Sequence, residues 1–243
     1  MLHGAQRGLF DLDFRIPAEC ADRLASGEAD LGIVPSFELT RQELTIVPGV
    51  GIACHGPVRS ILLVSSRPPS EIRTLAADSS SRTSVQLARV VLGRRYGAFP
   101  VIAPHAPDLQ AMLQVADAAL LIGDPALRID IGSGLYRIYD LGAEWVAMTG
   151  MPMVFAVWAG RKNAVTPEVT AAFRESCRYG CERIEEIVAC EAAQRRFPPD
   201  LIREYLTMRI VHELGPRDYQ GMDLFLSYAN QAVSSRERRE TAV

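Results

Sequence analysis

Short apolar runs alternate with amphipathic stretches over much of the chain, as expected when strands alternate with helices. Strands are predicted at residues 9–16, 31–34, 46–50, 60–65, 74–77, 99–102, 118–122 and 153–158. Helices are predicted from Pro17 to Gly27, from Thr83 to Gly97 and from Pro107 onward. Proline favours the first turn of a helix, and glycine favours the position just after the last turn. Strands separated by helices of this length predict an α/β fold with parallel sheets.

The last third of the chain has a helical pattern that begins near Thr166. Six residues repeat at helical spacing and predict one buried helix face: Val169, Phe173, Cys177, Cys181, Ile184 and Val188. On this pattern both cysteines are predicted to be core residues. Two further helices are predicted after Pro198 and around residues 222–228.

The stiff segment Arg67-Pro68-Pro69 separates two series of strands and helices. Residues 24–34 and residues 113–122 share one plan, in which a helix end is followed by an Ala-Asp pair and an apolar strand. This similarity predicts two lobes of related design with a ligand cleft between them. We place lobe 1 at residues 1–66 plus 147–243, with the C-terminal helices, and lobe 2 at residues 67–146.

The composition is that of a packed, soluble globule, with 48% hydrophobic and 23% charged residues. The formal net charge of -3 argues against nucleic acid or a membrane surface as a partner. The apolar run 115–123 contains Asp117 and is too short to span a bilayer. No signal peptide opens the sequence, so a cytoplasmic location is expected. The number of subunits stays open.

Several common chemistries are unsupported. Five cysteines without a Cys-x-x-Cys pair favour neither a disulfide framework nor a zinc site, and no metal or cofactor is expected. The four histidines are scattered, and the motifs of zinc proteases, serine hydrolases and phosphate-binding loops are missing from the sequence.

The most informative stretch is 78–84, which follows a predicted strand and enters a predicted helix. The first amides of a helix have no partner within it, and together with the helix dipole they attract an anion. The candidate binding residues here are Ser80, Ser81, Arg82, Thr83 and Ser84. An ordinary serine-rich helix cap is an equally good interpretation of the motif alone.

Three other turns supply candidates. Gly123 allows backbone to approach a ligand closely, and Asp124 is positioned either to cap a turn or to accept a bond from a substrate hydroxyl. Thr149 and Gly150 precede an apolar strand and form either a hinge or a cleft floor. Ser36 ends the predicted strand at residues 31–34. On their own, the turn at Gly123 and Asp124 and the segment at Thr149 and Gly150 are better explained as plain structural turns.

Taken in order, several motifs resemble the chorismate dehydratase family over about residues 8–228. They are Gly27 to Pro35, Val47 to Ala53, Gly56 to Ile61, Asp78 to Ser84, Leu121 to Leu127 and Asp140 to Trp145. The resemblance implies a two-lobed fold like that of type II periplasmic binding proteins. It also implies a cytoplasmic, cofactor-free hydro-lyase. Such enzymes convert chorismate into 3-[(1-carboxyvinyl)oxy]benzoate, which opens the futalosine route to menaquinone.

A dianionic substrate fits the candidate site. The serine-rich helix start and Arg82 are expected to hold the substrate carboxylates. Asp124 is the candidate catalytic carboxylate, and a carboxylate of the substrate itself is the alternative proton acceptor. Two other functions stay open: a non-catalytic solute-binding protein, and the sister enzyme of the futalosine pathway that shares this fold.

The sequence departs from the family at its front. Family members begin with a strand and a Tyr-Leu-Asn segment that supplies a cleft-facing asparagine, and Met1 falls just after that point. We expect the natural protein to start upstream. Without that strand, its neighbours in the sheet are expected to lose their ladder partners.

Overall fold

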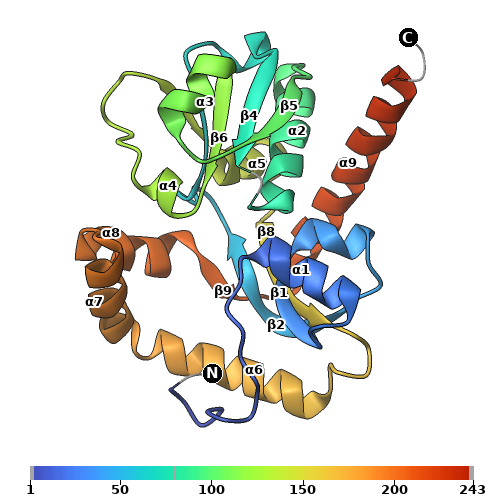
Figure 1. Ribbon diagram of the computed structural model, residues 1–243, viewed down its shortest axis with the longest axis vertical. Coiled ribbons are helices and arrows are strands. Elements are labelled where there is room, and N and C mark those ends of the chain that lie inside the picture. Colours follow the sequence, from blue (N-terminus) through green and yellow to red (C-terminus); the bar gives the residue numbers. More distant parts are fainter. Residues whose placement is uncertain (1–2, 79, 241–243) are drawn as a thin grey trace.

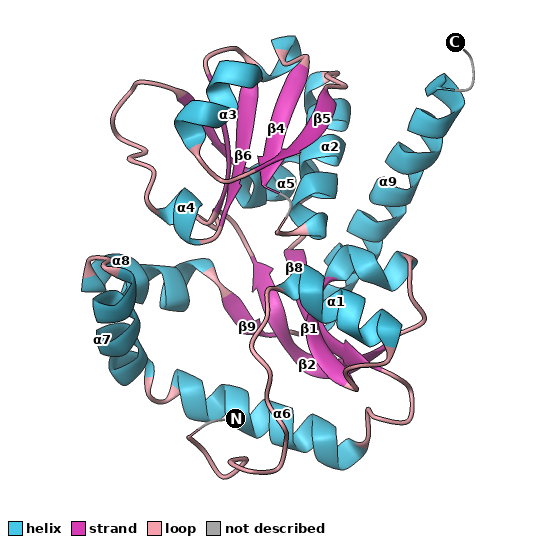
Figure 2. Ribbon diagram, viewed as in Figure 1, coloured by secondary structure: helices cyan, strands magenta, loops and turns pink. Residues whose placement is uncertain are grey.

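The computed structural model describes residues 3–78 and 80–240, with side chains as far as residue 233. Figures 1 and 2 show an upper and a lower lobe, each built around a sheet with helices beside it. The strands are β1 Leu31–Pro35, β2 Thr45–Cys54, β3 Ile61–Ser65, β4 Thr74–Asp78, β5 Val101–His105, β6 Ala118–Ile122, β7 Arg137–Asp140, β8 Met153–Gly160 and β9 Val211–Glu213.

The helices account for most of the remaining chain. The α-helices are α1 Pro17–Ser26, α2 Arg82–Tyr96, α3 Leu109–Val115, α4 Asp124–Leu127, α5 Leu141–Thr149, α6 Pro167–Cys181, α7 Ile184–Arg195, α8 Pro199–Glu204 and α9 Pro216–Glu240. Short 3₁₀ helices lie at Ser36–Thr40 (η1) and Pro69–Glu71 (η2), and a π-helical turn lies at Tyr205–Arg209 (η3).

The two sheets differ in strand direction. In the upper lobe the order is β5-β4-β6-β3-β7, where β4 runs parallel to β5 and β6 and β3 runs antiparallel to its neighbours. In the lower lobe the order is β1-β8-β2-β9, and all pairs are antiparallel. The prediction of parallel sheets is therefore right only for β4, β5 and β6. Helical crossovers within one lobe connect these three strands, whereas the chain changes lobes before β3 and before β8.

The helix signals in the sequence act as expected at both ends of α1 and α2. Pro17 opens α1, and Gly27 closes it in the left-handed conformation at φ 79°. The Ser81 hydroxyl caps α2 by accepting a bond from the Ser84 amide, and Gly97 closes that helix at φ 67°. The predicted strand 99–102 begins two residues late, at Val101, because Pro100 has no N–H for a ladder.

The predicted strand at residues 9–16 is wrong. These residues form no strand, and Leu9 and Phe14 are 63% and 70% exposed. β1 lies at the end of its sheet, so within the described residues its outer edge has no strand beside it. Segments without a ladder neighbour gain no inter-strand hydrogen bonds, which explains why the alternation at residues 9–16 yields no strand.

The predicted single helix face after Thr166 divides between two helices. α6 ends at Cys181 and α7 begins at Ile184, because the chain leaves the helical path at Arg183. Phe173 packs beneath β2, whereas Val188 packs against Leu127 in the upper lobe. The prediction that both cysteines of this face are core residues is wrong for Cys181, which is exposed, and Cys177 is only partly buried.

Thiol labelling of the native protein is expected to distinguish the exposed cysteines from the buried ones by their rates of reaction. Burial raises the pKa of the Cys54 thiol to about 12, so this thiol stays protonated and inert near neutral pH. Burial raises the pKa of Cys177 to about 12 as well. Iodoacetamide should therefore label the exposed Cys181 and Cys190 first, as read by mass spectrometry of peptides. Rapid labelling of Cys54 before unfolding would contradict this result.

The strand pairing bears on the lobe boundaries. β3, which the sequence analysis assigned to lobe 1, pairs with β6 and β7 in the upper sheet. We therefore propose that the upper lobe spans residues 61–149. The two crossing segments then lie between Cys54 and Ile61 and between Thr149 and Met153. Every helix in the described part of the chain is too short or too polar to cross a lipid bilayer.

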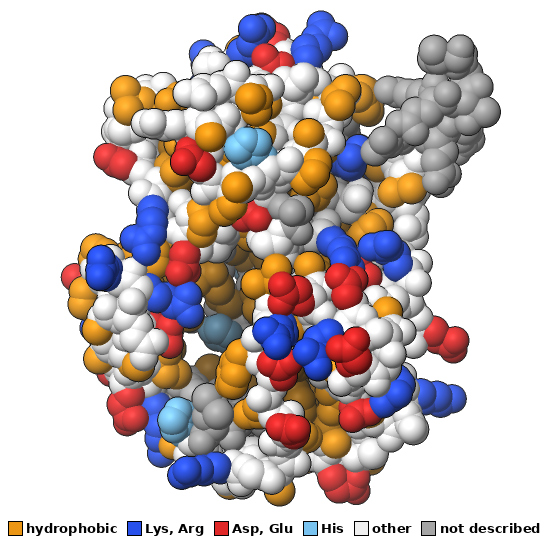
Figure 3. All heavy atoms as spheres, in the orientation of Figure 1, with side chains coloured by type: hydrophobic (Ala, Val, Ile, Leu, Met, Phe, Trp, Pro, Cys, Tyr) orange, Lys and Arg blue, Asp and Glu red, His pale blue; other side chains and the backbone are white. Residues whose placement is uncertain are grey.

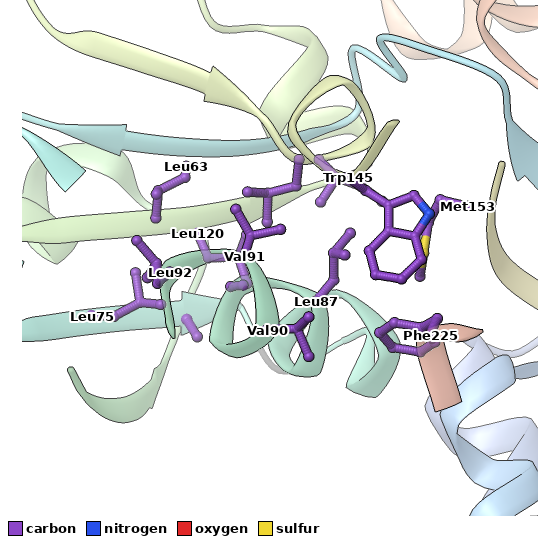
Figure 4. Close-up of a cluster of buried hydrophobic side chains, with 14 of the residues drawn as sticks. Leu63, Leu75, Leu87, Val90, Val91, Leu92, Leu120, Trp145, Met153 and Phe225 are labelled. Carbon is purple, nitrogen blue, oxygen red and sulfur yellow. The ribbon is translucent and has the colours of Figure 1, made fainter. Parts of the chain in front are cut away.

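One hydrophobic core continues from the upper lobe into the lobe junction, as Figure 4 shows. Leu87 and Leu92 of α2 pack with the upper sheet, and Trp145 of α5 lies beside Phe225 of α9. The Trp145 ring is fully buried and donates a bond from Nε1 to the Pro152 carbonyl at 3.0 Å. The junction between the lobes is thus packed rather than open on this side.

Candidate functional site

The serine-rich helix start lies at the face of the upper lobe that meets the lower lobe. The Ser80 amide donates to Asp78 Oδ1 at 2.9 Å, which holds the turn between β4 and α2. The Ser81 and Ser84 hydroxyls lie 3.0 Å apart, and Ser84 is fully buried. Some of these serines therefore make hydrogen bonds within the helix start itself, as the helix-cap interpretation requires.

Thr83 of α2 reaches the lower lobe. Its hydroxyl accepts a bond from the Phe37 amide at 3.1 Å and lies 3.4 Å from the Ser36 hydroxyl. Ser36 in turn donates to the Val154 carbonyl at 2.8 Å. The structure therefore brings together Ser36 and the helix start, two candidates that are 47 positions apart in sequence.

Arg82 is engaged within the protein. Its guanidinium binds Asp22 of α1 at 2.7 Å and Glu38 of η1 at 3.1 Å, so both partners belong to the lower lobe. Burial acts to lower the pKa of Arg82, but the hydrogen bonds to these carboxylates outweigh burial and raise that pKa. The guanidinium expected to hold a substrate carboxylate instead joins the two lobes in this structure.

A cavity of about 410 Å³ lies at the carboxyl ends of the parallel strands β4 and β5. Its lining comes from both lobes and consists of Ile16, Asp78, Ser80, Pro104, His105, Ala106 and Pro107. Figure 3 shows the surface hollowed between the upper and lower lobes. Ligands of α/β proteins commonly bind beyond the carboxyl ends of parallel strands, and this volume suits a small molecule.

The predicted turn at Gly123 and Asp124 is not part of this cavity's lining. Gly123 adopts φ 66° and donates its amide to the Ser60 carbonyl at 2.7 Å. Asp124 opens α4 and binds Arg195 of α7 at 2.9 Å. The Tyr205 hydroxyl contacts Ser60 at 3.0 Å, and burial raises the pKa of that phenol. This turn therefore joins the upper lobe to the C-terminal helices.

The predicted turn at Thr149 and Gly150 forms the C-terminal end of α5. The Thr149 hydroxyl donates to the Trp145 carbonyl at 2.8 Å and accepts from the Met151 amide at 3.1 Å. Gly150 caps the helix at φ 70°, and its carbonyl accepts from Arg217 at 2.9 Å. Thr149 ends α5 and Gly150 lies in the crossing segment that follows, which favours the hinge interpretation over the cleft floor.

Sequence reasoning missed the acid–base groups that line the cavity. Asp78 and His105 are direct neighbours in the parallel ladder of β4 and β5, and Asp78 is 6% exposed. The predicted strands ended at residues 77 and 102, so neither side chain was assigned to a sheet edge. A second missed pair, His55 and Asp218 at 2.8 Å, lies where the chain leaves β2 for β3.

The site can bind an anion and move a proton. Helix amides and hydroxyls are the groups that serve the first task, and an imidazole such as that of His105, which lines the same cavity, is a group that serves the second. Among the described residues, no group of three or more His, Cys, Asp or Glu side chains is arranged to hold a metal ion.

Comparison with known proteins gives two kinds of similarity. The sequence model of a family described as menaquinone biosynthesis matches residues 5–231. The chain is 32% identical over 209 residues to a protein of Thermus thermophilus named chorismate dehydratase, covering 79% of this chain and 76% of that protein.

Two solved structures share the fold. A protein of Archaeoglobus fulgidus matches with a TM-score of 0.62 at 18% identity, over 92% of this chain and 85% of that one. The periplasmic aliphatic sulphonate binding protein of Escherichia coli matches with a TM-score of 0.61 at 19% identity, over 92% and 76%. The architecture is therefore that of periplasmic binding proteins, as the sequence motifs predicted.

Proposed function

Since this chain belongs to the menaquinone biosynthesis family, we propose that it is a chorismate dehydratase acting as a cofactor-free hydro-lyase. The similarity to the Thermus thermophilus enzyme over most of both chains supports this activity. The product would be 3-[(1-carboxyvinyl)oxy]benzoate, the first compound of the futalosine route. We also propose a cytoplasmic location.

The reaction depends more on how the enzyme positions the substrate than on a strong catalytic group. A proton leaves the ring carbon that bears the ether, and its C–H electron pair becomes the third double bond of the ring. The hydroxyl leaves the neighbouring carbon and takes up a proton to form water. Because the product ring is aromatic, an enzyme that orients the substrate and relays one proton can suffice.

The observation that supports this proposal most is the start of α2 beside a cavity lined by both lobes. A substrate carboxylate at this point would meet helix amides and the Ser80 hydroxyl. Residues proposed to complete the binding site are those around the start of α2, namely Ser36, Ser81, Arg82, Thr83 and Ser84. The other binding residues expected from the motifs, Gly123, Thr149 and Gly150, lie outside the lining of this cavity. Asp124 remains the proposed catalytic carboxylate from the motif, although Arg195 binds it in this structure.

The protein incubated with chorismate is expected to consume it and release an aromatic product. Ultraviolet absorbance of a substituted benzoate and a mass lower than that of chorismate by one water would identify the product. Heat-denatured protein serves as the control. A protein that binds chorismate without forming product would contradict the proposed activity.

A non-catalytic binding protein is the second candidate, because a solved neighbour of this fold is itself a binding protein. The same incubation separates the two, since a binding protein gives calorimetric affinity without turnover. Turnover of a futalosine derivative, but not of chorismate, would indicate the sister enzyme instead.

A further inference from the structure

We propose that the helices α7 and α8 form a strap, residues 184–204, that moves with the upper lobe when the two lobes rotate relative to each other. The chain enters the strap from α6 and leaves it through η3 for β9, so both of its ends come from the lower lobe. Figure 1 shows the strap below α4, on the side of the molecule opposite α9. Such a motion goes beyond the proposed reaction and does not depend on it.

The apolar side of the strap is buried against the upper lobe. Leu127 of α4 is 4% exposed and lies in a hydrophobic cluster whose other buried members all come from the strap. These members are Val188, Ala192, Phe197 and Ile202. Where the structure describes side chains, the two clusters around the lower sheet contain no residue of 184–204. The apolar contribution to holding the strap therefore comes from the upper lobe.

Polar and ring contacts join the strap to the same part of the upper lobe. Arg195, at the end of α7, binds the Asp124 carboxylate at 2.9 Å. The Arg195 carbonyl accepts a bond from the Arg128 guanidinium at 2.8 Å. The same guanidinium lies 4.3 Å from the centre of the Phe197 ring. Directional contacts of this kind fix how the strap lies on α4 as well as where it lies.

Both ends of the strap have irregular backbone. At its start Arg183 separates α6 from α7 with the non-helical angles φ -117° and ψ 31°. At its end lies the π-helical turn η3, in which the Ile210 amide donates to the Tyr205 carbonyl at 3.2 Å. Helices bend at such interruptions, and hinges consist of a few residues at the ends of elements. The Tyr205 hydroxyl also lies 3.0 Å from that of Ser60, so this bend touches the first crossing segment.

The position of the strap makes its attachment important. The core around Trp145 and Phe225 packs the lobes together at the junction with α9. Since the strap lies on the opposite side of the molecule, a rotation about that junction separates the lobes most where α4 meets the strap. The strap must then either follow α4 or lose the buried contacts of Leu127. Following α4 keeps those contacts and bends only the two irregular ends.

Hydrogen–deuterium exchange of the whole chain tests the docking of the strap. Leu127→Ala removes the upper-lobe side chain from the cluster. We expect strap amides to exchange at least about tenfold faster in this variant, because truncating a buried leucine weakens local packing by more than this factor. Val47→Ala, in the lower-lobe cluster that packs against α6, is the matched control and should leave strap exchange within about twofold of the wild type. Circular dichroism confirms that both variants fold.

Distances between spin labels test the motion without truncating the cluster. Cys190 of the strap, Gln114→Cys in the upper lobe and Lys162→Cys in the lower lobe are exposed labelling positions, used two at a time. Cys54 is buried and stays unlabelled. The other cysteines are replaced by serine: Cys20, Cys177 and Cys181, and Cys190 where it is not labelled. Each pair is measured with Arg82 present and in Arg82→Met, which removes a guanidinium contact between the lobes.

We expect the distance between the lobe labels to shift or broaden in Arg82→Met. The strap should keep its distance to the upper-lobe label and change its distance to the lower-lobe label in the same way. The reverse pattern would assign the strap to the lower lobe and overturn the proposal. So would unchanged distances in all three pairs, because the lobes would then not rotate. Faster strap exchange in Val47→Ala than in Leu127→Ala would also contradict docking on the upper lobe.

Discussion

Trp145→Ala is expected to lower the free energy of unfolding by about 3–5 kcal/mol, the usual cost of truncating a buried tryptophan. The side chain is fully buried and packs edge-on against Phe225 and Tyr228 of α9. Figure 4 shows it beside Met153 and Phe225, at the place where the two lobes meet. Truncation would leave a cavity between α5, β8 and α9 and would leave the Pro152 carbonyl without its donor.

Urea denaturation followed by circular dichroism measures this change. Trp145→Phe is the graded control, because it keeps an aromatic ring and loses the Nε1 hydrogen bond. A loss of about 1–2 kcal/mol is expected for it. If Trp145→Ala lost less than about 1 kcal/mol, the junction core would not contribute to stability as its burial suggests.

Arg82→Met is expected to lower the free energy of unfolding by about 2 kcal/mol, the scale of a hydrogen bond to a charged group. Arg82 binds Glu38, whose side chain is only 1% exposed, and it also binds Asp22. Removing the guanidinium leaves a buried carboxylate with less compensation, which is costly in a poorly solvated place. Because the partners lie in the other lobe, the same change also loosens contact between the lobes.

Arg41→Met is the matched control for this experiment. Arg41 binds the same oxygen of Glu38 at 3.1 Å, but its side chain is 55% exposed and belongs to the same lobe. Without Arg41, Glu38 keeps its bonds from Arg82 and Gln42, and the lost guanidinium is the solvent-exposed one, so this variant should cost less stability than Arg82→Met. Equal losses from both variants would contradict a special role for Arg82.

The candidate site was predictable where a local motif marks it. Residues 80–84 follow a strand and start a helix in the structure, as the pattern of serines after an apolar run predicted. The contact between Ser36 and Thr83 was not predictable, because it depends on how the two lobes meet. His105 was missed for a related reason, since only the pairing of β4 with β5 places it beside Asp78.

The sequence by itself determined the positions of most helices and strands. Prolines, glycines and capping hydroxyls act within a few residues of their own positions, so Pro17, Gly27, Ser81 and Gly97 mark α1 and α2 without help from the rest of the chain. The order of the family-like motifs also indicated the two-lobed architecture, because proteins of one fold carry the same turns at the same places along the chain.

Only the tertiary structure decided which segments pair and which charges meet. The alternation at residues 9–16 satisfies the local pattern of a strand, yet it forms none without a neighbour for its backbone groups. The predicted helix face after Thr166 contacts both lobes, because the helix is interrupted at Arg183. Arg82 binds carboxylates that are 60 and 44 positions away in sequence. Packing of the two lobes brings such partners together, and a local sequence pattern cannot predict which distant residues will meet.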